Sequence, residues 1–385
     1  MSGNTITSEA GVGPSLPTDH FTVYIDNSNN AQTGYAIANP IRVWDTSQAV
    51  VTEFTGAQLS ATLRDKAGVT LETQSFNVRG GSQLAEFASQ RFPASVGPGF
   101  EGSIEFSTGF GQSNARAVAL RYDNASQDVF TTVPVILNVP DQNEVTQASP
   151  QHKTIPRFEA TTLFYPQVAD GGTYRTNFIL VNPADAATSA TLEFFADNGT
   201  ALSLPIDGVA RTAVTVSLNA KGVARILTDG TSSEIHKGWA RVTQPPVVPW
   251  AAIGGSAIFQ TVVEGRITSE AGVSSSPIAS HFTTVVNSLD STQSGIAICN
   301  PNNSNVNVTL NLRDTSGQIV ASVVKTLAPL AHVAQYFTEM FPTGFDEFEG
   351  TLEIVSASGP VSGVALRYDN PGGTVFATAP VIVIP

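Results

Sequence analysis

Short runs of alternating apolar and polar residues, many of them β-branched or aromatic, recur along the whole chain. Phe21–Ile25 and Ser103–Phe106 are two such runs, and clusters of Asn, Gly, Pro and Asp bound them. Turn-forming clusters, such as those at 26–30 and 65–68, follow at intervals of about ten residues. Alternation with a period of two places one set of side chains on one face of a strand. The pattern therefore predicts an all-β fold of antiparallel β-sandwiches.

Two segments carry apolar residues at helical spacing instead. In each, apolar residues stand three to five positions apart and a proline follows. Proline disfavours a helix that continues through it, so any helix here is short. We expect one or two helical turns over Leu84–Phe92 and over Val333–Phe341, each capping the end of a sandwich.

A repeated heptapeptide reveals how the strands are grouped. Ile-Thr-Ser-Glu-Ala-Gly-Val occurs at residues 6–12 and again at 267–273, and each copy opens a stretch of repeated sequence. Leu-Arg-Tyr-Asp-Asn at 120–124 returns at 366–370, and a more distant third copy begins at 164–166 with Phe-Tyr-Pro. Repeats of this length are whole domains, each large enough to bury one hydrophobic core. The chain is therefore predicted to contain three tandem antiparallel β-sandwich domains, which we call modules.

The repeats also set the expected boundaries. We assign residues 1–12 to a lead-in strand, 13–140 to the first module, 141–157 to a linker, 158–273 to the second module and 274–385 to the third. The linker is polar, contains two prolines and lacks an apolar period. Since no such spacer separates the second module from the third, we expect those two to meet more rigidly.

An insertion at 41–62 distinguishes the first module from the third. Twenty-two residues separate Pro40 from Leu63, whereas ten separate the equivalent positions of the third module. The extra residues alternate like a β-hairpin, and loops added to a sandwich are common recognition sites. Trp44 and Phe54 are its binding candidates, because aromatic rings stack on sugars and fill protein interfaces. The alternative is that both rings cover the core of their own module.

Composition narrows the range of partners. Charged residues make up 13% of the chain, against about 25% in an ordinary soluble domain. A net charge of −13 with nineteen basic residues argues against nucleic acid, because phosphate contacts require clustered Lys and Arg. No apolar run approaches the roughly 20 residues that span a bilayer, so we expect no membrane insertion. Residues 1–7 lack signal-peptide features, which is compatible with a removed signal or with an intracellular protein.

Candidate chemical groups each have a structural explanation that is at least as good. Cys299 stands where a small apolar residue stands in the other modules, which favours a core position over a nucleophile. His20 and His281 precede a strand without a Cys or second His nearby, which does not favour zinc. Acidic residues lie in Asn- and Gly-rich turns, where calcium is an alternative to turn formation: Asp26, Asp123, Asp128 and Asp170. We therefore predict no catalytic residue, no metal and no cofactor.

The Arg-x-Asp pairs are a stronger structural signal. Arg121 and Asp123, like Arg367 and Asp369, stand two residues apart and share one face of a strand. A bidentate arginine–carboxylate pair there would hold a sheet edge or a loop. Glu101 and Glu349 are further candidate partners.

The repeated phrases resemble a known group of proteins. Ser-Glu-Ala-Gly-Val, an apolar strand ending in Asn-Pro, and Val-Ala-Leu-Arg-Tyr-Asp-Asn followed by Phe-Thr-Thr-Val-Pro resemble the tandem modules of large secreted bacterial proteins. The middle copy, with Gly-Trp-Ala-Arg-Val, is similar to a companion module that alternates with them. The resemblance covers nearly the whole chain and implies Ig-like sandwiches on an extracellular or cell-surface protein. It assigns no activity and no functional residue.

These observations favour a structural, non-catalytic extracellular protein, such as a surface stalk or a fibre subunit. At 267–273 the heptapeptide closes the second module, whereas at the N-terminus it has no preceding module to close. An unpaired strand is a template for pairing, so we expect head-to-tail self-association or association with other surface proteins. The predicted assembly residues are Ile6, Thr7, Ser8, Glu9, Ala10, Gly11 and Val12. The alternative is an adhesin-like module that binds glycan or protein.

Overall fold

A computed structural model gives the fold of the chain. It describes residues 9–12, 18–39, 44–45, 50–51, 56–108, 115–123, 129–133, 135–137, 162–245, 252–341, 344–369 and 375–384. Nearly all regular structure in these ranges is β, arranged in several antiparallel sheets, none of them closed. The predicted all-β fold class is confirmed. Of the predicted linker 141–157, nothing lies within the described residues.

The first module contains two sheets that face each other. The five-stranded sheet has the order β11 (Val135–Leu137), β1 (His20–Asn27), β8 (Phe100–Thr108), β5 (Ala57–Asp65) and β6 (Thr70–Val78). The four-stranded sheet has the order β10 (Val129–Val133), β9 (Arg116–Asp123), β2 (Ala31–Asn39) and β7 (Ser82–Phe87). Buried side chains from both sheets form one core. In β5, every second residue from Ala57 to Leu63 is buried, as alternation requires.

The second module is built from two four-stranded sheets and a small hairpin. One sheet has the order β12 (Thr162–Asp170), β19 (His236–Thr243), β14 (Thr188–Ala196) and β17 (Ala213–Leu218). The other has the order β18 (Val223–Leu227), β13 (Tyr174–Val181), β20 (Gly254–Val263) and β21 (Arg266–Ser274). The hairpin pairs β15 (Leu204–Ile206) with β16 (Val209–Arg211).

The third module repeats the strand order of the first. Its large sheet has the order β26 (Ile319–Leu327), β25 (Val306–Asp314), β28 (Glu349–Ser356), β23 (His281–Asn287) and β31 (Val381–Val383). In its other sheet, β29 (Val361–Asp369) lies beside β24 (Gln293–Cys299), β30 (Val375–Ala379) and β22 (Ile278–Ala279), and β27 (His332–Tyr336) pairs with β24. The sequence repeat is therefore also a repeat of topology.

The two expected helical segments are helical only at their ends. The helices α1 (Ala88–Arg91) and α3 (Phe337–Met340) have four residues each. Leu84 and Val333, which we expected in a helix, lie instead in strands β7 and β27. Each helix begins where a side chain accepts from the backbone N–H three residues earlier, Gln90 in α1 and Glu339 in α3. Within the described ranges, no helix is long and apolar enough to cross a membrane.

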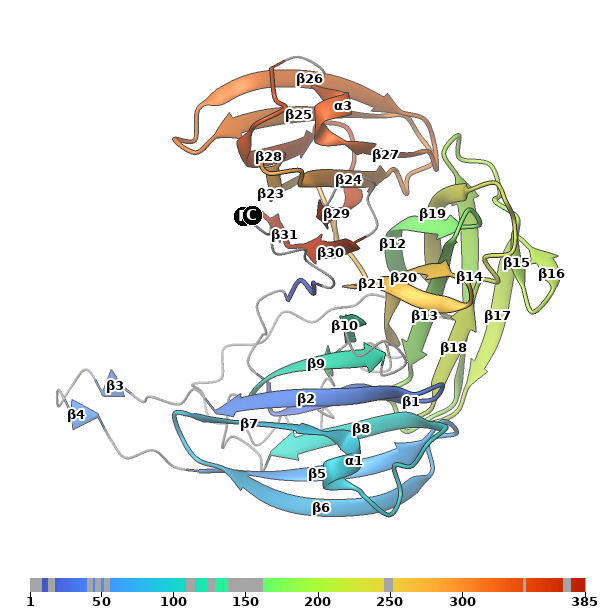
Figure 1. Ribbon diagram of the computed structural model, residues 1–385, viewed down its shortest axis with the longest axis vertical. Coiled ribbons are helices and arrows are strands. Elements are labelled where there is room, and N and C mark those ends of the chain that lie inside the picture. Colours follow the sequence, from blue (N-terminus) through green and yellow to red (C-terminus); the bar gives the residue numbers. More distant parts are fainter. Residues whose placement is uncertain are drawn as a thin grey trace.

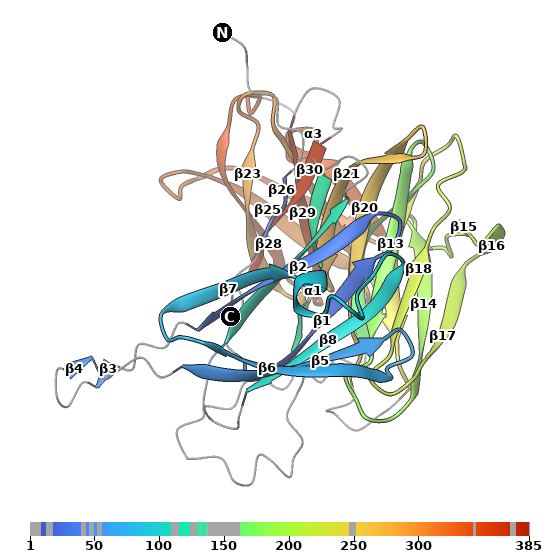
Figure 2. The ribbon, with the colours of Figure 1, turned by 60° about the horizontal axis from the view of Figure 1, so that its bottom comes forward.

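The predicted insertion is shorter than the sequence suggests. Its last residues, 57–62, belong to β5 in the middle of the large sheet. The strands β3 (Trp44–Asp45) and β4 (Val50–Val51) pair with each other, as the alternating pattern predicts. They lie apart from the sheets in both views (Figures 1 and 2). Phe54 lies outside the described residues, and for Trp44 only the backbone is described.

The second module contacts both other modules. Figure 1 shows it beside the first and third modules, with β10, β21 and β30 close together in the middle. Ile179, Val181, Val223 and Ile258 of the second module join the core cluster of the first. The backbone N–H of Val223 also donates to the carbonyl of Lys66, at 3.0 Å. Apolar side chains and a backbone hydrogen bond therefore also join the first module to the second.

Candidate functional site at the junction of the modules

The second copy of the heptapeptide lies in β21, at the point where the three modules meet. β21 pairs with β20 and so completes a sheet of the second module, as the repeat predicts. On its other side it packs against β10 of the first module and β30 of the third. The same residues lead directly into the third module. One segment therefore contacts all three modules.

A buried ion cluster fixes β21 on the first module. The Arg121 guanidinium donates from Nε to Asp26, at 2.7 Å, and from Nη1 to both oxygens of Glu270, at 2.8 Å. All three side chains are almost fully buried, and the Gln260 amide donates to Glu270 from the neighbouring strand. Arginine presents several N–H donors in a rigid plane, which suits two carboxylates at once.

Burial and charge act in opposite directions on these groups. Burial raises the pKa of Glu270, while Arg121 and Gln260 oppose that rise. The pKa of Asp26 is lowered, because the Arg121 charge and hydrogen bonds from Ser28 outweigh its burial. A buried charge is tolerated only when it is paired and hydrogen-bonded. Removing Arg121 would therefore leave the buried carboxylates of Asp26 and Glu270 without their shared positive partner.

A close backbone approach explains the glycine of the heptapeptide. The hydroxyl of Thr132, in β10, donates to the carbonyl of Gly272, at 3.0 Å. A Cβ atom built on Gly272 would lie 2.0 Å from the Thr132 carbonyl oxygen. Any other residue would force the two strands apart, so this position requires glycine.

The N-terminal copy of the heptapeptide makes the same contacts with the third module. The Arg367 guanidinium donates to Glu9, at 2.6 Å, and to Asp369, at 2.8 Å. The Thr378 hydroxyl donates to the Gly11 carbonyl, at 3.2 Å, and a Cβ atom on Gly11 would lie 1.7 Å from the Thr378 carbonyl oxygen. Glu9 and Gly11 match Glu270 and Gly272 in the heptapeptide.

The two outer modules therefore hold each other's leading segments. The segment before the third module docks on the first, and the segment before the first docks on the third. Of the predicted assembly segment, Glu9 and Gly11 thus contact the third module of the same chain. Ile6, Thr7 and Ser8 lie outside the described residues.

A cavity of about 390 Å³ lies between the two docked segments. Its wall repeats the same symmetry, with Gly11, Val12 and Thr378 on one side and Gly272, Val273 and Thr132 on the other. Within the described ranges, no group of three or more His, Cys, Asp or Glu side chains is placed to hold a metal ion.

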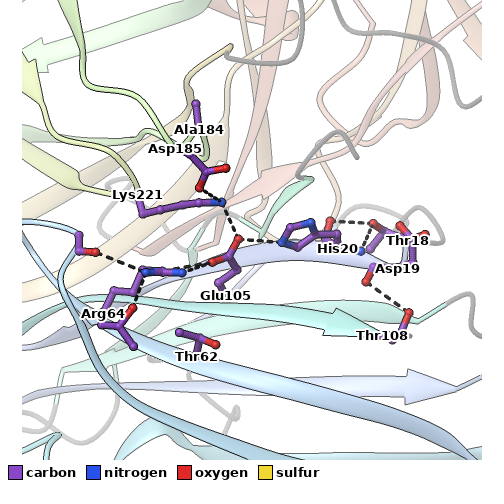
Figure 3. A network of polar contacts seen from close by, with 12 residues as sticks. Thr18, Asp19, His20, Thr62, Arg64, Glu105, Thr108, Ala184, Asp185 and Lys221 are labelled. Carbon is purple, nitrogen blue, oxygen red and sulfur yellow. Dashed lines mark hydrogen bonds and ion pairs between the residues drawn. The ribbon is translucent and has the colours of Figure 1, made fainter. Parts of the chain in front are cut away.

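A second polar network joins the first module to the second. Glu105 accepts hydrogen bonds from Arg64 and His20, each at 2.7 Å, and from Lys221 of the second module, at 2.8 Å (Figure 3). Although burial opposes them, these donors hold the pKa of Glu105 well below its usual range. His20 is thus a carboxylate partner at this interface.

The contact between the second and third modules is aromatic and also includes polar groups. Trp239, fully buried, donates from its indole N–H to the Leu330 carbonyl, at 2.7 Å. Its ring stacks on Phe195, and Cys299 of the third module packs in the same cluster. Burial raises the pKa of the Cys299 thiol, which agrees with the predicted core position.

The structure shows which carboxylates the two arginines of the Arg-x-Asp pairs contact. Arg367 pairs with Asp369, whereas Asp26 and Glu270 are the carboxylates that Arg121 contacts at 2.7–2.8 Å. Glu101, a candidate from the sequence, instead accepts from Lys66 and Tyr24. Sequence reasoning missed Glu9 and Glu270 as arginine partners. A signal for this pairing was present in the sequence. The heptapeptide with its glutamate and the Leu-Arg-Tyr-Asp-Asn phrase with its arginine each occur twice.

Comparison with known proteins adds little to this geometry. A scan against protein-family models found no match, and a search of curated proteins found none. Among solved structures, dimeric latent PorU from Porphyromonas gingivalis aligns at 12% identity with a TM-score of 0.16. The alignment covers 95% of this chain and 34% of that chain, so this chain spans about a third of its length. A TM-score this low carries no conclusion about fold or function.

Proposed function

We propose that the protein is a non-catalytic structural protein of the cell exterior. Its three pairs of sheets serve as Ig-like modules of a surface stalk or of a fibre subunit. The observation that supports this proposal is the reciprocal docking of Glu9 on Arg367 and of Glu270 on Arg121. These contacts use charged side chains to join one module to another, which is what a structural array requires.

Residues 6–12 are the element that would join copies. The groove formed by Arg367 and Thr378 accepts a heptapeptide segment, and it does not depend on that segment coming from the same chain. Exchange of an identical element between protomers is a low-cost route to assembly, because every contact already exists in the monomer. The N-terminal segment of one copy would then dock on the third module of the next, head to tail.

Charge exchange between two variants tests this assembly. Glu9→Arg and Arg367→Glu each place like charges in the groove, so each variant alone should stay monomeric. In an equal mixture, the arginine introduced at position 9 can meet the glutamate introduced at position 367 only between different chains, and the same holds for the two native side chains. We expect sedimentation velocity to show dimers or longer species in the mixture alone. The double variant, which restores the pair within one chain, is the control.

Two results would contradict this assembly. One is a mixture that sediments as monomers while the double variant regains the docked segment. The other is a wild-type chain that remains monomeric at high concentration and forms no fibres by electron microscopy.

The alternative is an adhesin-like module that binds glycan or protein. The observation that favours it is the β3–β4 hairpin, which pairs with no other described strand and lies apart from the sheets (Figure 2). A glycan array with wild-type protein and Trp44→Ala separates the two functions. Binding that the substitution abolishes would favour the adhesin, and assembly would be unaffected by it.

A further inference from the structure

The large sheets of the first and third modules have equivalent faces that point away from the core of their own module. The second module covers this outer face in the first module but not in the third. In the first module, this face of the large sheet lies against the second module. Tyr24 is 0% exposed there, and Ile136 is 8% exposed. A Cβ atom on Gly254 of the second module would lie 2.5 Å from Ile136, which shows how closely the two modules approach.

The equivalent face of the third module is bare. Val285 stands where Tyr24 stands in the first module, and Ile382 stands where Ile136 stands. They are 51% and 57% exposed. Val285 lies in β23 and Ile382 lies in β31, which pairs with it. Apolar side chains grouped on one face and left exposed mark an interaction surface.

The polar part of the interface is also repeated. Glu353 accepts from Arg313, at 2.7 Å, and from His281, at 3.0 Å, as Glu105 accepts from Arg64 and His20. In the first module, Lys221 of the second module supplies a further charged donor to that carboxylate. The hydrogen bonds from Asn311, Arg313 and His281 hold the pKa of Glu353 below its usual value, although burial opposes them. Glu353 therefore remains a carboxylate that can accept a lysine.

A glycine turn at the edge of this face is likewise covered in the first module and exposed in the third. A Cβ atom on Gly68, in the first module, would lie 2.0 Å from the carbonyl oxygen of Ala220. Gly317 occupies the same turn in the third module with the same φ of +85°, and a Cβ atom there meets nothing within 4 Å. The third module thus keeps the turn without the neighbour.

We propose that the outer face of the third module, formed by β31, β23 and β28, binds a further module of the second type. The partner is a β-sandwich that presents an apolar sheet face with a lysine at its rim, as Ile179, Val181 and Lys221 do here. The second module described here cannot serve, because the first module already covers its face. The partner is therefore a different copy of such a module. This surface is separate from the residue 6–12 groove, so the two proposals can fail independently.

Thiol labelling of a fusion protein tests the proposal. A second copy of residues 141–273 is joined after Pro385 of the full chain, and Val285→Cys provides a reporter on the face. The native Cys299 is buried and gives little background. We expect the appended module to slow labelling of the introduced thiol by at least about tenfold relative to the unfused Val285→Cys chain, because docking excludes the reagent.

Two matched controls define the contact. Lys221→Glu in the appended copy alone should bring labelling to within about threefold of the unfused rate, since two carboxylates would then face each other. Val324→Cys, on β26, should label equally in all chains, because its first-module counterpart Ser75 stays exposed beside the second module. Rapid labelling at position 285 beside an appended module that resists protease would overturn the proposal.

The overall dimensions of the same fusion protein give an independent measurement. Val285→Lys places a charge beneath the docked module, and burying that charge without a partner would be costly. We expect small-angle X-ray scattering to show a larger radius of gyration for the fusion with Val285→Lys than for the fusion without it. The same substitution in the unfused chain should leave the radius unchanged. Equal radii for the two fusions would contradict the proposal.

Discussion

The two docked copies of the heptapeptide share their contacts but differ in their surroundings. Glu270 is fully buried, whereas Glu9 is 30% exposed and its partner Arg367 is 35% exposed. Gln260 of the adjacent strand supports Glu270, because β21 is itself part of a sheet. Asp26 holds Arg121, while Asn287 stands at that position in the third module and Arg367 turns to Asp369 instead. The same peptide thus forms a buried contact in one place and a partly exposed contact in the other.

Removing each arginine should give the largest difference between the two sites. Arg121→Met leaves Asp26 and Glu270 buried together, and we expect it to cost about 3–5 kcal/mol of unfolding free energy. Arg367→Met breaks a partly exposed pair and should cost under about 1 kcal/mol. Urea denaturation of both variants measures the difference. Equal losses would show that the two sites are energetically alike.

Adding a methyl group to each glycine should give a smaller difference. Gly272→Ala forces β21 away from β10, and we expect a loss of about 1–3 kcal/mol. In Gly11→Ala the segment can leave its groove, so global stability should change by less than about 0.5 kcal/mol. Protease cleavage within residues 1–17 should nevertheless become faster, because the segment is released. Unchanged cleavage in Gly11→Ala would mean that this glycine does not determine docking.

The smallest expected effect is a pH dependence of docking at the N-terminal site. Burial and the neighbouring Asp369 raise the pKa of Glu9 to about 7, although Arg367 opposes the rise. Since this pKa is higher in the docked state than the ordinary 4.5, protonation favours docking. Docking should be strongest below about pH 4.5 and should weaken as pH rises through about 7.

Protease protection of the N-terminal segment between pH 5 and pH 8 measures this dependence. Glu9→Gln carries no titrating proton at that position, so its protection should vary little with pH. Protection that increases toward pH 8 in the wild-type protein would reverse the predicted sign.

The sequence predicted local patterns well and contacts between modules poorly. The alternation in β5 and the turn at Gly68 follow from neighbouring residues, so they could be read directly. The helical spacing of Leu84 and Phe87 predicts a helix at the end of β7, but pairing with β2 overrides that local signal. The Arg121–Glu270 pair joins residues 149 apart, and no local pattern specifies such a contact. The one indication of this contact in the sequence was that the repeated phrases containing the two residues each occur twice.

The position of β21 in the chain also bears on the order in which the protein can fold during synthesis. The first module leaves the ribosome with Arg121 paired to Asp26 but without Glu270, which is made 149 residues later. The second module cannot close its sheet until residue 274 has been made. The N-terminal segment is made first, but its docking site in β30 is completed only at residue 379. Its docking therefore follows the synthesis of β30, and the nascent chain carries residues 9–12 unbound until then.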